Sequence, residues 1–452
     1  MFPKNFIWGV ASSAYQIEGA YQEDSKALSI WDVFANNPLK IANNENGNMA
    51  CDSYHLYETD LNIMQDLKIP AYRFSISWPR VIKNLNGDIN EAGLAYYDKI
   101  VDGLIARNII PYITLFHWDL PQYLQEIGGW ENPKTIEAFE HYARVIAKHF
   151  DKRVTNYFTI NEPQIIVGLG YKLGLHAPGL KLSDEKCLLI SKNLLLAHGK
   201  ATLALKATAT TNIKVGIAST GKLCFPKNAT TKNIAAAQKA SFEVDLDNEN
   251  LYFSHSLFLD PIFLKHFPKE INFPLSEKEI KIISTPIDYL GINIYNGSEV
   301  DEDGHYLLKK QGHAQTQLNW PITPLVMYYG LKQLSQRYQI PIVITEDGIA
   351  CSDKIYLDKQ VHDYQRIDFL QRYLQQLLNV IEEGYDIQGY FHWSLTDNFE
   401  WHNGYSPRFG LVYIDYANYQ RIIKDSGYWY AQVIQKNQII KMDEYLKQKL
   451  TS

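Results

Sequence analysis

Two glutamates follow strand-like runs of the sequence and could form a catalytic pair. Residues 341–348 read Pro-Ile-Val-Ile-Thr-Glu-Asp-Gly, and residues 157–163 read Tyr-Phe-Thr-Ile-Asn-Glu-Pro. A short apolar run bounded by Pro and Gly is typical of a strand that is buried on both faces. A carboxylate at the mouth of such a strand loses hydration, which is costly unless partners or function compensate. Two such strands could place Glu162 and Glu346 across one cleft.

A pair of carboxyl groups suits the cleavage of a glycosidic bond. One group must be protonated to donate to the leaving oxygen, and the other must be ionised to attack the anomeric carbon. The sequence lacks the motifs of metal-dependent hydrolases, serine hydrolases and nucleotide-binding enzymes. It has no His-Glu-x-x-His, no metal-spaced Cys/His cluster, no Gly-x-Ser-x-Gly and no Walker loop. We therefore predict no metal and no cofactor. A non-catalytic sugar-binding barrel is the alternative from another class.

Polar and aromatic residues lie within or just beyond most of the strand-like runs. They are Gln16, Arg73, His117, Trp118, Asn161, Asn293, Tyr295, Trp393, Glu400 and Trp401. Any one of them could be an ordinary polar residue at a strand end. In a barrel, however, the carboxyl ends of all strands meet on one face, which is where such enzymes build their sites. The set predicts a pocket for a neutral, polyhydroxylated ligand.

Strands and helices alternate along the chain. Helix-compatible segments separate the strand-like runs, for instance 53–67, 91–107, 133–150, 191–207 and 363–382. The eight strand-like runs are 6–12, 71–78, 111–118, 155–163, 214–220, 288–295, 341–348 and 388–397. This order predicts an α/β fold, a single parallel (β/α)₈ TIM barrel over residues 1–452.

A doubly wound open sheet is the alternative fold, but no strand–turn–helix unit opens with a phosphate-binding glycine fingerprint. The glycine-rich stretch 168–174 has the wrong spacing and is interpreted as a loop. The longest interval between strands, residues 221–287, predicts a helical insertion on the barrel.

Composition excludes several partner classes. The chain has 452 residues, 46% of them hydrophobic and 21% charged, with a net charge of −6. It can bury a large core, and without a dense Lys/Arg run it is a poor partner for nucleic acid or anionic membranes. No apolar run approaches the roughly 20 residues that span a bilayer. Four dispersed cysteines and no secretory pattern indicate reduced thiols and a cytoplasmic location. The oligomeric state stays open.

Ordered motifs along essentially the whole chain resemble glycoside hydrolase family 1, the retaining β-glycosidases. They are Phe6-Ile-Trp-Gly-Val-Ala, Tyr15-Gln-Ile-Glu-Gly, Ser29-Ile-Trp-Asp, Cys51-Asp52, Tyr54-His55, Tyr72-Arg-Phe-Ser-Ile-Ser-Trp, Phe116-His-Trp-Asp-Leu-Pro, Thr159-Ile-Asn-Glu-Pro, His176-Ala-Pro-Gly, Gly291-Ile-Asn-Ile-Tyr, Ile344-Thr-Glu, Trp393-Ser-Leu-Thr-Asp-Asn-Phe-Glu-Trp and Arg408-Phe-Gly.

The resemblance implies a role for each matching residue. Glu162 would be the acid/base and Glu346 the nucleophile, with the two carboxyl groups about 5–5.5 Å apart. Arg73 and Tyr295 would keep Glu346 ionised. The remaining residues would bind substrate: Asn161 at the 2-hydroxyl; Gln16, His117, Glu400 and Trp401 at the outer hydroxyls; Trp393 as the floor with Phe409 beside it; and Trp320 in the leaving-group subsite.

The family resemblance also bears on the substrate. Family members that act on 6-phosphorylated glycosides replace the Glu-Trp pair that stands here as Glu400-Trp401. An ionised Glu400 would repel a phosphate. We therefore expect an unphosphorylated β-glycoside or oligosaccharide, most simply a β-glucoside, with galactosides and fucosides open. A 6-phospho-β-glucosidase is the alternative.

One departure from the family pattern lies next to the nucleophile. Asp347 stands where Asn commonly follows. Two like charges about 8 Å apart, at an effective dielectric of about 40, interact by roughly 1 kcal/mol. We expect an ionised Asp347 to raise the pKa of Glu346, so that Asp347→Asn moves the acidic limb of kcat/KM down by about half a unit.

Overall fold

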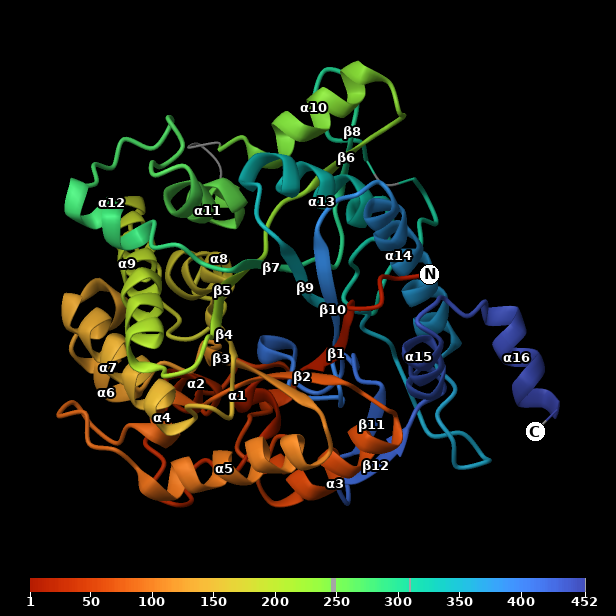
Figure 1. Ribbon diagram of the computed structural model, residues 1–452, viewed down its shortest axis with the longest axis horizontal. Coiled ribbons are helices and arrows are strands. Elements are labelled where there is room, and N and C mark those ends of the chain that lie inside the picture. Colours follow the sequence, from red (N-terminus) through yellow and green to blue (C-terminus); the bar gives the residue numbers. More distant parts are fainter. Residues whose placement is uncertain (245–248, 309, 452) are drawn as a thin grey trace.

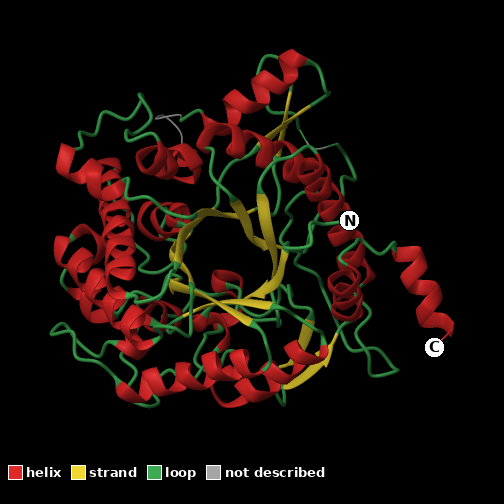
Figure 2. Ribbon diagram, in the orientation of Figure 1, coloured by secondary structure: helices red, strands yellow, loops and turns green. Residues whose placement is uncertain are grey.

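Eight parallel strands close into a barrel in the spatial order β1-β10-β9-β7-β5-β4-β3-β2. The structure, a computed structural model, describes residues 1–244, 249–308 and 310–451. Figure 2 shows the ring of strands with helices around it. The predicted barrel and each of its strands are confirmed, with small differences at strand ends. The strand bounds are β1 Ile7–Ala11, β2 Ala71–Ser75, β3 Ile110–Phe116, β4 Asn156–Asn161, β5 Lys214–Ser219, β7 Tyr289–Asn293, β9 Ile342–Asp347 and β10 Ile387–Trp393.

Most of the helices surround this ring (Figure 1). The five helices predicted from periodicity are α3 Ser53–Asp66, α5 Glu91–Ala106, α7 Pro133–His149, α9 Asp184–Thr208 and α14 Tyr364–Glu382. Helix α9 begins earlier than expected because Ser183 caps it, accepting a hydrogen bond from the backbone N–H of Lys186. The other helices are α1 Ala14–Ile17, α2 Ile30–Ala35, η1 Ala42–Asn44, α4 Trp78–Val81, α6 Gln122–Glu126, η2 Gly129–Glu131, α8 Pro163–Ile165, α13 Leu325–Tyr338, η5 Trp401–Asn403, α15 Asp425–Lys436 and α16 Met442–Thr451.

Residues 221–287, where the sequence predicts a helical insertion, also contain a strand. Strand β6 (Cys224–Pro226) pairs in parallel with β8 (Ser298–Val300), which follows the sixth barrel strand. In Figure 1 this small sheet and α10 project at the top of the view. The helices of the interval are α10 Thr231–Phe242, η4 Glu249–Phe253, α11 His255–Phe263 and α12 Glu277–Ile283. A second small sheet joins β11 (Val412–Asp415) to β12 (Gln420–Ile423).

The prediction of a loop in the glycine-rich stretch was wrong. Ile166–Lys172 form a π-helix, η3, directly after α8. The glycines serve close packing: a Cβ on Gly168 would lie 2.6 Å from the ring of Phe253, and one on Gly170 would lie 2.6 Å from the carbonyl of Ala177. These glycines, which the sequence analysis interprets as part of a loop, instead allow close contacts around a π-helix.

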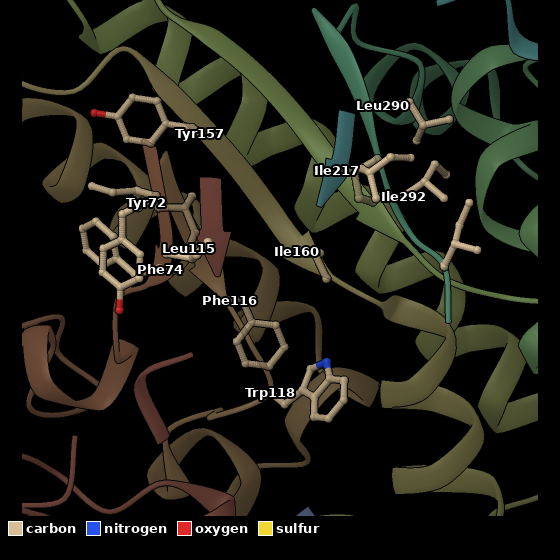
Figure 3. Close-up of a cluster of buried hydrophobic side chains, with 14 of the residues drawn as sticks. Tyr72, Phe74, Leu115, Phe116, Trp118, Tyr157, Ile160, Ile217, Leu290 and Ile292 are labelled. Atoms are coloured by element: carbon tan, nitrogen blue, oxygen red, sulfur yellow. The ribbon is translucent and has the colours of Figure 1, made fainter. Parts of the chain in front are cut away.

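Two apolar clusters lie on opposite sides of the strand ring. Inside the barrel, the rings of Tyr112 on β3 and Phe391 on β10 are 5.0 Å apart although β1 and β2 separate these strands. The rings of Phe158 and Tyr289 meet similarly across β5. The larger cluster joins strands to helices, and Figure 3 shows part of it, from Tyr72 and Phe74 to Leu290 and Ile292. Packing on both faces explains why the strands are nearly continuous apolar runs.

A buried ion network ties the loops after β9 and β10 to α14 and α15. Lys424 Nζ donates to Asp353 and Asp397, each at 2.6 Å. Asp397 also accepts from Arg408 at 2.7 Å, and Arg366 donates to Asp353 at 2.7 Å. Burial raises the pKa of Asp353, but Arg366 and Lys424 outweigh it and hold that pKa below its usual range. The network fixes the segment that continues from Asp397 to the predicted substrate-binding residues.

All four cysteines are free and buried. Among the described residues, no helix combines the length and apolar character needed to cross a bilayer.

Candidate active site

A cavity of about 390 Å³ lies at the carboxyl ends of the barrel strands, within the range of small-molecule sites. The strand ends bring residues from distant parts of the chain together there: Asn293 ends β7, Glu346 is next to last in β9, and Trp393 ends β10. The predicted residues that line the cavity are His117, Trp118, Glu162, Asn293, Tyr295, Trp320, Glu346, Trp393, Glu400, Trp401 and Phe409.

Glu346 is held by a cation and a phenol. Arg73 Nη1 donates to one carboxylate oxygen at 2.7 Å, and the Tyr295 hydroxyl donates to the other at 2.6 Å. Both Arg73 and Glu346 are buried. The guanidinium also lies over the ring of Phe158, 5.3 Å from its centroid. Burial raises the pKa of Glu346, whereas the charge of Arg73 and the bonds from Tyr295 and Arg73 oppose that rise.

Among the described residues, the side chain that hydrogen-bonds to the second carboxyl, that of Glu162, is neutral. Asn293 Nδ2 donates to Glu162 Oε1 at 2.7 Å, and the Thr345 hydroxyl donates to Asn293 Oδ1 at 2.6 Å, which fixes the amide. Burial and then the charge of Glu346 raise the pKa of Glu162. Because Arg73 and Tyr295 favour the anion at Glu346, the first proton lost by this pair leaves Glu346 and the remaining one stays on Glu162.

Asn161 connects the partners of the two carboxyl groups. Its Oδ1 accepts from Arg73 Nη2 at 2.6 Å and from Asn293 Nδ2 at 3.2 Å, and its Nδ2 lies 3.1 Å from His117 Nε2. The indole N–H of Trp118 donates to the backbone carbonyl of Asn161 at 2.9 Å. The position of the guanidinium that supports Glu346 therefore depends on Asn161.

The far end of the cavity is aromatic and carries a third carboxyl. The indole N–H of Trp393 donates to Glu400 at 3.2 Å. The His117 ring stacks on those of Trp393 and Trp401, with centroids 5.8 and 6.0 Å apart. Burial raises the pKa of Glu400 to about 8. Burial and the charge of Arg73 hold the pKa of His117 well below its usual range, so this imidazole is neutral.

Three cavity residues have left-handed backbone conformations. The φ angles are 79° at Trp118, 49° at Glu162 and 54° at Trp401. For side chains other than glycine this region is costly, and it is concentrated at functional sites.

Comparison with known proteins decides the family. The family model described as glycosyl hydrolase family 1 matches residues 1–439. The chain belongs to this family.

Relatives and solved structures agree with this assignment. The chain is 40% identical over 457 residues to β-glucosidase A of Acetivibrio thermocellus, covering 96% of this chain and 98% of that protein. It is 35% identical over 480 residues to an aryl-phospho-β-D-glucosidase of Bacillus subtilis, covering 96% and 98%. The structure of a Thermotoga maritima β-glucosidase in complex with glucoimidazole is 37% identical and superimposes with a TM-score of 0.88 over 97% of this chain and 99% of that one.

Within this family 1 site, three predicted residues lie behind the cavity wall. Arg73 and Asn161 contact the residues that line it, as described above. Gln16 is also absent from the lining, and its Nε2 donates to Asn398 at 2.9 Å and to the carbonyl of Phe399 at 2.8 Å. Contact of Gln16 and Asn161 with substrate therefore stays a prediction, as does the spacing of the catalytic carboxyl groups.

Sequence reasoning missed the rim of the cavity. Its apolar residues come from α8, η3, η4 and the loops after β5 and β8, and they include Ile165, Leu169, Leu223, Phe253 and Leu318. No strand-end pattern signals these positions. His176 and His402 also line the cavity, and their side chains bond to one another.

The carboxyl of Asp347 is sequestered from solvent. Its Oδ2 accepts from the Tyr390 hydroxyl on β10 at 2.8 Å, and the residue has no solvent exposure. Burial raises the pKa of Asp347 well above its usual range, against the bonds from Tyr390 and the backbone of Gly348. Burial therefore disfavours the charge that the sequence-based expectation assigned to Asp347.

Proposed function

We propose that this protein is a retaining β-glucosidase that hydrolyses unphosphorylated β-glucosides by double displacement. The observation that carries the proposal is the asymmetry of the carboxyl pair. Glu346 is bonded to a buried guanidinium and a phenol, whereas Glu162 bonds to an amide and has a raised pKa. One anionic and one protonated carboxyl are what the first step requires.

In that first step Glu162 gives its proton to the glycosidic oxygen. Glu346 attacks the anomeric carbon, the bond from that carbon to the leaving oxygen breaks, and a glycosyl ester forms. In the second step ionised Glu162 takes a proton from water, the water oxygen attacks the anomeric carbon, and the ester bond to Glu346 breaks. Two inversions leave the β configuration unchanged.

The raised pKa of Glu162 supports its change of role between the steps. Part of that rise comes from the negative charge on Glu346. When Glu346 becomes an ester the charge disappears, so the pKa of Glu162 falls and the carboxyl can lose its proton. The same residue then serves as the base for water.

The surroundings of the cavity support a neutral sugar over a phosphorylated one. Among the described residues that line the cavity, Lys222 is the only Lys or Arg, and it belongs to the half-buried rim. A phosphate beside Glu400 would lose its hydration without a cation to compensate. Because burial raises the pKa of Glu400 to about 8, this missing cation matters more than the repulsion expected from an ionised Glu400.

The alternative is a 6-phospho-β-glucosidase, and the phospho-specific relative from Bacillus subtilis is the observation that favours it. The experiment compares kcat/KM for an aryl β-glucoside and for the same compound with a 6-phosphate. We expect the unphosphorylated compound to be preferred by more than tenfold. A preference for the phosphate would contradict the proposal, and no turnover of either compound would favour the non-catalytic barrel.

A further inference from the structure

The cavity becomes more exposed from floor to rim. Glu162, Glu346, Trp393 and Glu400 are buried, whereas the rim residues Leu169, Phe253, His402 and Asn403 are half-buried. If one sugar ring occupies the floor beside the carboxyl pair, the group attached to its anomeric oxygen must extend toward the rim. The rim residues therefore contact the leaving group, an argument that rests on the proposed function.

The rim contains both apolar and polar residues. The apolar residues include Ile165, Leu169 and Phe253 from α8, η3 and η4, and the polar residues include His402 and Asn403 from η5. A sugar ring has apolar C–H faces and a polar edge of hydroxyl groups, so it suits a rim that offers contacts of both kinds.

A hydrogen bond between two histidines determines whether His402 can donate or accept a further hydrogen bond. His176 Nε2 lies 2.9 Å from His402 Nδ1, and only one proton can lie between them. The His176 ring is buried between aromatic rings, 5.2 Å from that of Trp31 and 5.6 Å from that of Trp118. Burial lowers the pKa of both histidines, so both rings are neutral.

The position of that proton follows from the other nitrogen of His176. His176 Nδ1 is buried and has no partner among the described residues. A buried N–H without an acceptor is rarer than an acceptor without a donor, so we assign the proton of His176 to Nε2. His176 then donates to His402 Nδ1, and the proton of His402 lies on Nε2. None of the described side chains or backbone groups accepts from His402 Nε2.

We propose that His402 determines leaving-group specificity by donating a hydrogen bond from Nε2 to a hydroxyl oxygen of a leaving sugar, and that His176 positions it. The substrate class is then a β-linked disaccharide or short oligosaccharide rather than a simple aryl or alkyl glucoside. A neutral donor offers no ionic attraction, so anionic leaving groups gain no advantage. In the second step the same donor binds a sugar acceptor that competes with water.

The experiment measures kcat/KM for cellobiose and for 4-nitrophenyl β-glucoside. The quantity compared is the value for cellobiose divided by the value for the aryl glucoside. His402→Ala removes the donor, and we expect the ratio to fall about five- to tenfold, the change typical of one hydrogen bond. His402→Gln, whose amide can donate, should restore most of it. His176→Phe keeps the aromatic packing but frees His402, and should lower the ratio in the same direction.

His141→Ala is the matched control, because His141 lies on α7 and does not line the cavity. It should leave the ratio where it is. With the aryl glucoside as donor, transfer to added glucose should fall in His402→Ala by the same factor as the ratio. Equal loss on both substrates, or an unchanged ratio in both His402→Ala and His176→Phe, would overturn this inference while leaving the proposed function intact. If the unmodified protein cleaves neither cellobiose nor 4-nitrophenyl β-glucoside, both this inference and the proposed function are overturned.

Discussion

At the scale of single residues, two similar side chains, Glu162 and Glu346, have different surroundings and therefore different affinities for a proton. We propose that Glu162 is the acid, so Glu162→Gln should reduce kcat/KM by about 10²–10⁴-fold for substrates with poor leaving groups. Activated aryl glucosides need little protonation and should lose far less in the first step. Kinetics on an aryl series ranked by leaving-group pKa would measure this difference. A uniform loss across the series would argue against the acid role.

The coupling between the two carboxyl groups can be measured directly. Because the charge of Glu346 contributes to the raised pKa of Glu162, Glu346→Gln should lower the pKa of Glu162. A ¹³C NMR titration of labelled Glu162 in both proteins would show the change. An unchanged titration would mean that burial alone sets this pKa.

The structure changes the prediction for Asp347. Its carboxyl is buried against Tyr390, and burial raises its pKa well above the usual range, which disfavours the charged form. Asp347→Asn should therefore leave the acidic limb of kcat/KM where it is, in place of the half-unit shift expected from the sequence. A fall of that limb by half a unit would show that Asp347 is ionised in the working enzyme.

At the scale of elements, strand ends could be predicted from the sequence and rim segments could not. Each strand is a local apolar run, so the positions of Glu162, Glu346 and Asn293 followed from sequence and barrel geometry together. The His176–His402 bond joins residues 226 positions apart, on segments without a strand pattern. Strand β6 has only three residues and ends in Pro226. The sequence of the π-helix η3 is rich in glycine, as loop sequences often are. Such features depend on long-range packing that local patterns do not encode.

The ion network gives a prediction at the same scale. Lys424→Met would leave the carboxyl groups of Asp353 and Asp397 buried with too few cations. Breaking a buried pair in this way costs about 3–5 kcal/mol, so the free energy of unfolding should fall by that amount. Denaturant titration would measure it. Lys436→Met, at the exposed end of α15, the helix that begins directly after Lys424, is the control. Equal stability of the two variants would mean that the network contributes little.

At the scale of the whole molecule, the barrel explains why the site combines residues from so many segments. Eight strands deliver their ends to one face, and the helices and the large apolar cluster hold those ends in place. The chemistry then depends on which residues end which strands, and this agrees with membership of glycosyl hydrolase family 1 over residues 1–439.

The most direct test of the account traps the covalent intermediate. A 2-fluoro-glucoside with an activated leaving group should form the glycosyl ester but release it slowly, because the fluorine disfavours positive charge at the ring. Peptide mass spectrometry of the inactivated protein should find the added sugar on Glu346, in the peptide that contains residues 342–347. Glu346→Ala should take up no label, and added azide should restore its turnover with a product of inverted configuration. A label on any other residue, or hydrolysis by the unmodified protein that yields inverted product, would contradict the central claim.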